Sequence, residues 1–249
     1  MDQGRRTFLR TFGLTVLGLP LASASAALTF QSVQKSPRKR LALAIDIQRL
    51  ANPVLLATLV QACHKAHNVP QIPDPSKQVW WCKQTGLQET LGLEKNSPFP
   101  RSLRHLNTFV LCNHCKNPPC VRVCPTGATF QRPNGVVAMD AHRCIGCRYC
   151  MAACPYGARS FNYFDPRRFL ENPNPGFPRR TKGVVEKCNL CEERLLEGKP
   201  PLCVSLSNGA IVFGDLEESR SLLVATLAER PSFLRKPWLG TEPHVFYLL

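Results

Sequence analysis

The 249-residue sequence lacks the motifs of the common enzyme classes. It has no phosphate-binding P-loop, no glycine fingerprint of a dinucleotide-binding fold, no Gly-x-Ser-x-Gly turn and no pair of carboxylates in a catalytic context. The six histidines have no paired spacing that would suit zinc or haem. These absences argue against the enzyme classes that depend on such motifs, and we expect no residue to act as an acid, a base or a nucleophile.

Long apolar segments are also absent beyond the first thirty residues, where none approaches the roughly 18 residues that a membrane helix needs. Residues 1–27 themselves predict a twin-arginine signal peptide. Arg5 and Arg6 precede a mildly apolar stretch and A-x-A cleavage sites after Ala24 and Ala26. An uncleaved anchor is the alternative. We expect export to the periplasm by a route that carries folded proteins, and a mature chain that is soluble or peripheral to the membrane.

Cysteine, in contrast, is abundant, with thirteen residues, and the formal net charge is +15. So many cysteines indicate disulfides, zinc sites or iron–sulfur clusters. The charge suits nucleic acid, an anionic membrane surface or an acidic protein partner. A cubane cluster with four thiolates carries a charge of about −2, so clusters would cancel part of the excess from within. The charge therefore identifies no particular partner.

Two cysteine runs decide among these options. They are Cys112-x2-Cys115-x4-Cys120-x3-Cys124 and Cys144-x2-Cys147-x2-Cys150-x3-Cys154, each followed directly by proline. The second has the spacing of bacterial ferredoxins, and the first has two extra residues before its third cysteine. Zinc ribbons separate their cysteine pairs by longer gaps, and disulfides do not explain the repeated Cys-Pro. Both runs therefore predict [4Fe–4S] clusters.

The spacing also predicts which cysteines share a cluster. Three closely spaced thiolates reach three irons of one cubane, whereas the fourth lies across a short helical turn and faces the other cluster. One cluster is then bound by Cys112, Cys115, Cys120 and Cys154. The other is bound by Cys144, Cys147, Cys150 and Cys124. This crossing places the two clusters close enough for electron hopping.

A third, looser group is Cys188-x2-Cys191-x11-Cys203, which needs a fourth ligand. Cys63, near the end of a helix predicted over residues 54–66, can supply it. In ferredoxin spacing, the three cysteines before Cys63 would stand at Pro53, Leu56 and Leu59, and the cysteine after Cys203 would stand at Ser207. These four positions would form a further ligand set, and none of them is a cysteine. Since the losses fall on one complete set, we infer a second ferredoxin-like module that retains one cluster and has lost the other to apolar side chains.

Cys82 is then left over, at the end of a buried strand predicted over residues 77–82. We expect it to be a core thiol. One alternative is that it replaces Cys63 as a ligand. Another is that the third group holds a [3Fe–4S] cluster with three cysteine ligands, or no cluster.

The predicted fold class is α+β, with two interleaved ferredoxin-like modules around the clusters. Residues 104–165 form a dicluster module inserted between residues 41–103 and 166–215, which together form the outer module. Residues 216–249 form a C-terminal helix, over 217–229, and a proline-containing strap. We expect the apolar end of the strap to fold back on the body, with docking on a partner as the alternative.

Three stretches, at residues 112–120, 144–150 and 187–191, resemble the four-cluster ferredoxin-like subunits of bacterial respiratory complexes. These are the electron-transfer subunits of dimethyl-sulfoxide, polysulfide and tetrathionate reductases and of nitrite-reductase-type systems. The resemblance covers roughly residues 40–249. Within the group, the twin-arginine signal and residues 161–167 and 239–243 are most similar to the periplasmic iron–sulfur subunit of the sulfite-reductase-associated transmembrane complex, which suggests sulfur metabolism.

This resemblance implies two partners: a polytopic quinone-reactive membrane subunit, and a molybdopterin enzyme or multihaem cytochrome c. It implies a non-catalytic subunit that relays single electrons between them, here through three [4Fe–4S] clusters. One rival hypothesis is an oxidoreductase that binds substrate at the cluster of the Cys188 group. Another is a nucleic-acid-binding cluster protein, which the export signal opposes.

Overall fold

The computed structural model describes residues 39–92 and 100–249, so the predicted signal peptide lies outside the described residues. The described residues belong to one compact unit. Its elements in chain order are β1 (Leu41–Asp46), η1 (Arg49–Ala51), α2 (Pro53–Ala66), η2 (Pro75–Lys77), β2 (Cys82–Gly86), α3 (Leu87–Leu91), α4 (Arg101–Arg104), β3 (Asn107–Leu111), α5 (Pro119–Arg122), β4 (Thr129–Gln131), β5 (Val137–Met139), α6 (Tyr149–Ala152), β6 (Ser160–Phe161), η3 (Pro166–Phe169), β7 (Val185–Glu186), α7 (Glu192–Leu196), α8 (Leu202–Leu206), β8 (Ile211–Asp215), α9 (Leu222–Glu229), β9 (Ser232–Leu234), η4 (Pro237–Leu239) and β10 (Val245–Leu248).

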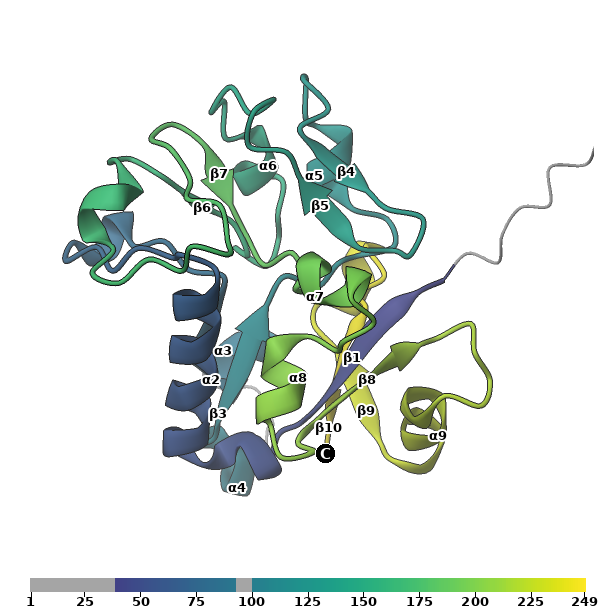
Figure 1. The fold of residues 1–249 in the computed structure, drawn as a ribbon. Coiled ribbons are helices and arrows are strands. Elements are labelled where there is room, and N and C mark those ends of the chain that lie inside the picture. The colour runs from purple at the N-terminus through teal and green to yellow at the C-terminus, as the bar shows by residue number, and fades with distance from the viewer. Residues whose placement is uncertain (1–38, 93–99) are drawn as a thin grey trace, which may run out of the picture. The chain divides into compact units, whose positions relative to one another are not determined.

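The largest sheet has four strands in the order β8-β1-β10-β9 (Figure 1). β1 pairs antiparallel with β8 and parallel with β10, with Leu43 opposite Val245. β9 completes the sheet beside β10. The end of the C-terminal strap thus folds back on the body, as expected. It does so as an inner strand of the sheet, so the chain after residue 216 is not a separate appendage.

The two faces of this sheet bury different side chains, because successive residues of a strand point to opposite faces. Leu43 and Ile45 of β1 belong to the main hydrophobic core. Ala42 and Ala44 face the other side, where they form a small core with Leu223 of α9. The small alanines allow α9 to approach closely, and the strap and α9 are thereby fixed to the first strand.

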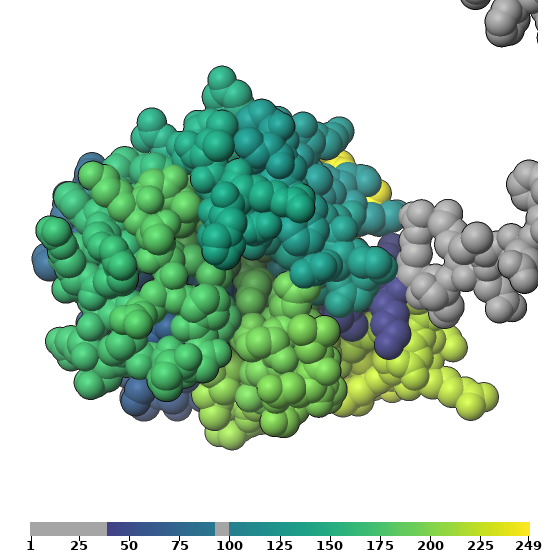
Figure 2. Space-filling view, turned by 45° about the horizontal axis from the view of Figure 1, so that its top comes forward, coloured from purple at the N-terminus to yellow at the C-terminus, as the bar shows by residue number. Residues whose placement is uncertain are grey.

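Three two-stranded sheets, β2-β3, β4-β5 and β6-β7, support the cysteine loops. β3 leads directly into the loop that begins at Cys112. A turn at residues 132–135 joins β4 to β5, where the amide of Arg132 donates to the carbonyl of Val136 at 2.8 Å. In the space-filling view, the teal and green segments around β4-β5 and β6-β7 form the upper and left regions of the face shown, above the lighter green of α7 and α8 (Figure 2).

The strand predicted over residues 77–82 is wrong, because β2 begins only at Cys82. Upstream of it, side chains rather than a neighbouring strand satisfy the backbone. The amide of Trp80 donates to Ser160 Oγ at 3.1 Å, and the Ser160 hydroxyl donates to the carbonyl of Trp80 at 3.2 Å. The predicted C-terminal helix is also shorter than expected, because Ser221 caps α9 by accepting from the amide of Val224 at 3.3 Å.

Short helices and small sheets in one unit make the fold α+β. The two interleaved ferredoxin-like modules remain a prediction, since the described residues do not divide between them. Among residues 39–92 and 100–249, no helix is both long enough and apolar enough to cross a membrane.

Candidate metal centres

The predicted ligand cysteines line three cavities, one for each predicted set. The first site has Cys112, Cys115, Cys120 and Cys154. The second site has Cys124, Cys144, Cys147 and Cys150. The third site has Cys63, Cys188, Cys191 and Cys203. All thirteen cysteines of the chain are free thiols.

The donor set, rather than the size of each cavity, identifies these sites. The three cavities are similar in size to a further cavity lined by Trp81 and Glu186 among others, but that further cavity has no cysteine. Four thiols around one cavity with apolar walls match the ligand requirement of a cubane cluster.

The three sites share one backbone feature. In each C-x-x-C segment, the residue before the second cysteine has a positive φ: 42° at His114, 73° at Gly146 and 60° at Leu190. This conformation costs a non-glycine residue roughly 1–2 kcal/mol, so it persists only where the surroundings require it. At Gly146 a Cβ atom would also collide with the carbonyl oxygen of Gly183. The third site therefore shares with the other two a left-handed residue directly before the second cysteine of the segment.

Short helices link neighbouring sites. Cys120 lies on α5 in the first site, and Cys124 follows that helix in the second site. α6 links the same two sites in the opposite order, because Cys150 on this helix belongs to the second site and Cys154 beyond it belongs to the first. The two helices α5 and α6 pack against each other. At the other end, Leu111 lines the third cavity and the next residue, Cys112, lines the first. The first site therefore lies between the other two.

A buried arginine lies between the first and second sites. Arg159 is 5% exposed, and its guanidinium hydrogen-bonds to Thr129 Oγ1 at 3.2 Å. Burial would lower the pKa of Arg159, but Coulombic attraction to Cys120, Cys150 and Cys112 in their thiolate form raises it. No described carboxylate forms an ion pair with this side chain. Because a buried charge is costly unless it is paired, Arg159 requires an anionic group in these cavities.

Two more buried groups point to the same requirement. Lys187 is 3% exposed, and its ammonium donates to the carbonyls of Val137 and Cys188 but, among the described residues, to no carboxylate. Asn113 lines the first cavity, and its side-chain amide has no hydrogen-bond partner in the described part of the chain. An anionic, sulfur-rich cluster would neutralise the cations and accept from the amide. The residues present therefore fit iron–sulfur clusters, which supply one-electron redox chemistry when bound.

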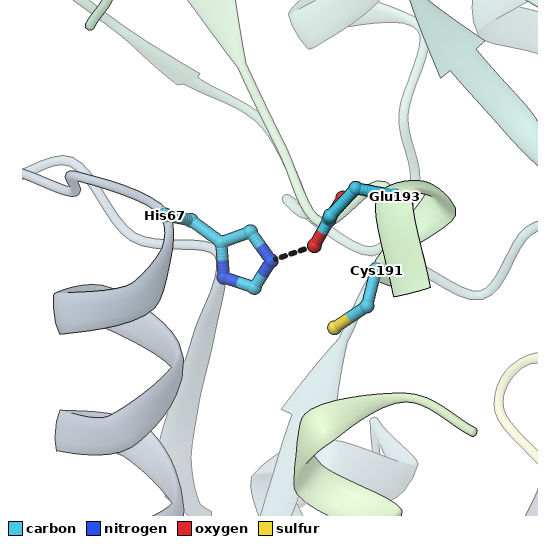
Figure 3. A group of neighbouring side chains, drawn as sticks. All are labelled: His67, Cys191 and Glu193. Carbon is cyan, nitrogen blue, oxygen red and sulfur yellow. Dashed lines mark hydrogen bonds and ion pairs between the residues drawn. The ribbon is translucent and has the colours of Figure 1, made fainter. Parts of the chain in front are cut away.

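His67 and Glu193 form a polar edge at the third site (Figure 3). His67 Nε2 is 2.9 Å from Glu193 Oε1, and His67 Nδ1 is 3.7 Å from Cys63 Sγ. The ring stacks on Trp81, with ring centroids 4.6 Å apart. Burial would lower the pKa of His67, but hydrogen bonds to Cys191, Cys63 and Glu193 raise it to about 12. His67 and Glu193 were not among the predicted site residues, although His67 follows Cys63 by one helical turn.

The C-terminal strap holds the loop of the first site, which the sequence did not reveal. The amides of Lys116 and Asn117 donate to the carbonyls of Glu242 and Thr241 at 2.9 and 3.1 Å. The Thr241 hydroxyl also hydrogen-bonds to the hydroxyl of Tyr156, which lines the first cavity. The strap therefore braces the first site from outside the two cysteine runs.

Three of the four positions of the missing ligand set are buried, and the fourth is exposed. Leu56 and Leu59 of α2 are fully buried, and α2 packs against α8. Ser207, at the end of α8, is also buried, and its hydroxyl accepts from the amide of Ile211 at 3.0 Å. Pro53 is the exposed first residue of α2. These residues supply packing and a helix end where cysteines would have held a further cluster.

Cys82 is buried, as expected of a core thiol, but it also lines the third cavity. The third cavity is thus lined by five cysteines rather than four. The odd cysteine count pointed to an extra thiol but did not indicate where it would lie.

The chain is similar to known iron–sulfur proteins. Residues 105–165, which include all eight cysteines of the first two sites, match the family model of the 4Fe-4S dicluster domain. The chain is 38% identical to the Hdr-like menaquinol oxidoreductase iron-sulfur subunit 1 of Archaeoglobus fulgidus, over 98% of this chain and 97% of the relative. It is 34% identical to a tetrathionate reductase subunit of Salmonella typhimurium, over 100% and 89%. It is also 34% identical to the menaquinone reductase iron-sulfur cluster-binding subunit of Nitratidesulfovibrio vulgaris, over 75% and 81%.

The position of Arg159 makes a testable prediction about potentials. Reduction adds negative charge to a cluster, so removing a buried cation beside two clusters should make both harder to reduce. In Arg159→Gln we expect the midpoint potentials of the first and second clusters to fall by on the order of 50–100 mV. A redox titration followed by EPR measures them. The exposed Arg220→Gln is the control, and unchanged potentials in Arg159→Gln would contradict the role given to this residue.

Proposed function

This chain is a member of the family of iron–sulfur electron-transfer subunits of respiratory oxidoreductases, and we propose that it relays single electrons through three [4Fe–4S] clusters. The clusters are held at the first, second and third sites. The number of three clusters is supported by the observation that each predicted ligand set lines its own cavity. The thiolates act as ligands, while burial and hydrogen bonds to sulfur adjust each potential.

The order of the sites gives the relay two ends. The second site opens toward the surface, because Cys147 is exposed and its neighbours Ile145 and Tyr149 are 67% and 62% exposed. The third site is enclosed, and its nearest polar edge is formed by His67 with the partly exposed Glu193. We place one redox partner at the second site and the other near the third, with the first site as the required intermediate.

The partners and the location are also part of the proposal. The relatives include subunits named for a menaquinol oxidoreductase, a menaquinone reductase and a tetrathionate reductase. Together with the resemblance of the cysteine runs, these names support a quinone-reactive membrane subunit at one end of the relay. A molybdopterin enzyme or multihaem cytochrome c takes the other end. The twin-arginine pattern supports a periplasmic location for the complex, and the substrates we favour there are sulfur compounds.

Substrate binding at the third site is less well supported. A cluster that binds substrate needs an open iron position and converging polar groups. Each of the five thiols at the third cavity belongs to a residue that is at most 8% exposed, and Phe109, Leu111 and Pro201 contribute apolar walls. We therefore keep the chain as a relay without its own substrate.

The middle position of the first site predicts where the relay can be interrupted. In Cys115→Ala with Cys120→Ala, the first cluster loses two ligands while the other sites stay intact, so the purified chain should keep about eight irons. In membranes that carry the whole complex, we expect electron flow from a menaquinol analogue to the terminal acceptor to be lost. Stopped-flow absorbance and activity assays measure this electron flow. Continued flow at the wild-type rate in a chain with eight irons would refute the order of the sites.

Export is tested separately. A fluorescent reporter that must fold in the cytoplasm is fused behind residues 1–30 and expressed in a bacterium with a twin-arginine translocase. We expect it in the periplasmic fraction, because paired arginines are the recognition feature of that route. The matched control replaces Arg5 and Arg6 by lysine and should stay in the cytoplasm. Equal distribution of both reporters would rule out the twin-arginine assignment.

A further inference from the structure

We propose that Cys82 is an alternative fourth ligand of the third cluster and can take the place of Cys63. This inference rests on the proposed function, since it requires a cluster at the third site. It assigns a ligand role to a thiol that the ferredoxin spacing leaves unused.

The first argument is the number and origin of the thiols. Cys188, Cys191 and Cys203 supply three ligands, and a cubane needs one more. Both Cys63 and Cys82 line this same cavity. They come from different elements, α2 and β2, which pack against each other. Two separate elements thus each present a thiol at the third cavity, although only one thiol is needed as the fourth ligand.

The second argument is the burial of the two thiols at one cavity. Cys63 and Cys82 both line the third cavity, and they are 7% and 1% exposed. Because both residues are shielded from solvent, whichever thiol is not bound to iron stays at the same cavity as the one that is. The unused thiol is therefore held ready at the site.

The exchange is chemically balanced. With a cluster bound, replacing Cys63 by Cys82 would exchange one iron–sulfur bond for another, and the proton of the Cys82 thiol would pass to the released Cys63 sulfur. Both thiols line the same cavity, where that transfer would take place. No electron is gained or lost and no other reactant is needed.

The resting ligand is assigned from the spacing of the cysteines. Cys63 is the residue from which the ferredoxin spacing of the outer module is counted, whereas Cys82 has no place in that spacing. The neighbouring histidines do not distinguish the two, since His67 Nδ1 lies 2.7 Å from the carbonyl of Cys63 and His64 Nε2 lies 3.1 Å from the carbonyl of Cys82. We therefore assign Cys63 as the resting ligand and Cys82 as its replacement.

The test compares four variants of the full chain, purified anaerobically beside the wild type: Cys63→Ala, Cys82→Ala, the double variant and Cys203→Ala. Iron and acid-labile sulfide per chain are measured, with EPR of oxidised and reduced samples. The wild type should hold about twelve irons. We expect each of the variants Cys63→Ala and Cys82→Ala to keep about twelve, with an altered signal of the third cluster in Cys63→Ala only. The double variant and Cys203→Ala should fall to about eleven with a three-iron signal, or to about eight.

Three outcomes would overturn the proposal. If Cys63→Ala alone loses iron as Cys203→Ala does, Cys82 cannot replace it. If Cys82→Ala alone does so, Cys82 is the only fourth ligand. If the wild type itself holds about eight irons, the third cluster of the proposed function is absent, and this failure is distinct because all variants then match the wild type. The eight irons of the first and second sites show that a variant has folded. If an alanine variant holds fewer than eight irons, the test is repeated with serine at the same position.

Discussion

The interaction on which the rest of the structure depends is the meeting of thiolates from distant segments around each cluster. It explains why α5 and α6 are only one turn long, since each must deliver cysteines to two sites. It explains the left-handed residues His114 and Leu190 in loops where an unliganded chain would avoid them. It also explains why the buried cation of Arg159 is tolerated without a carboxylate partner.

The outer part of the fold shows what happens when this constraint is removed. α2 is a continuous helix of 14 residues, capped by Asn52, whose side chain accepts from the amide of Val54 at 2.9 Å. At the corresponding place the first two sites have a loop and a four-residue helix. With no iron to reach, Leu56 and Leu59 bury their side chains against α8. Hydrophobic packing has replaced coordination, whereas Cys63, on the next turn of the same helical face, lines the third cavity.

The sequence was a good guide wherever the determinant is local, and a poor one elsewhere. Cysteine spacing predicted the three sets that line the cavities, and the crossing between α5 and α6, because short helical turns set those distances. It did not predict that the strap enters the main sheet beside β1, because strand pairing across about two hundred residues leaves no local pattern. Nor did it place Cys82, whose approach to Cys63 depends on the packing of β2 against α2.

Anomalous X-ray diffraction at the iron absorption edge, on crystals of anaerobically purified chain, would test the central claim most directly. The account predicts three iron peaks, one in each of the three cysteine cavities, with the first site between the other two. It also predicts no peak between α2 and α8, where Leu56 and Ser207 are buried. An iron peak at that position, or none beside Cys188, would contradict it.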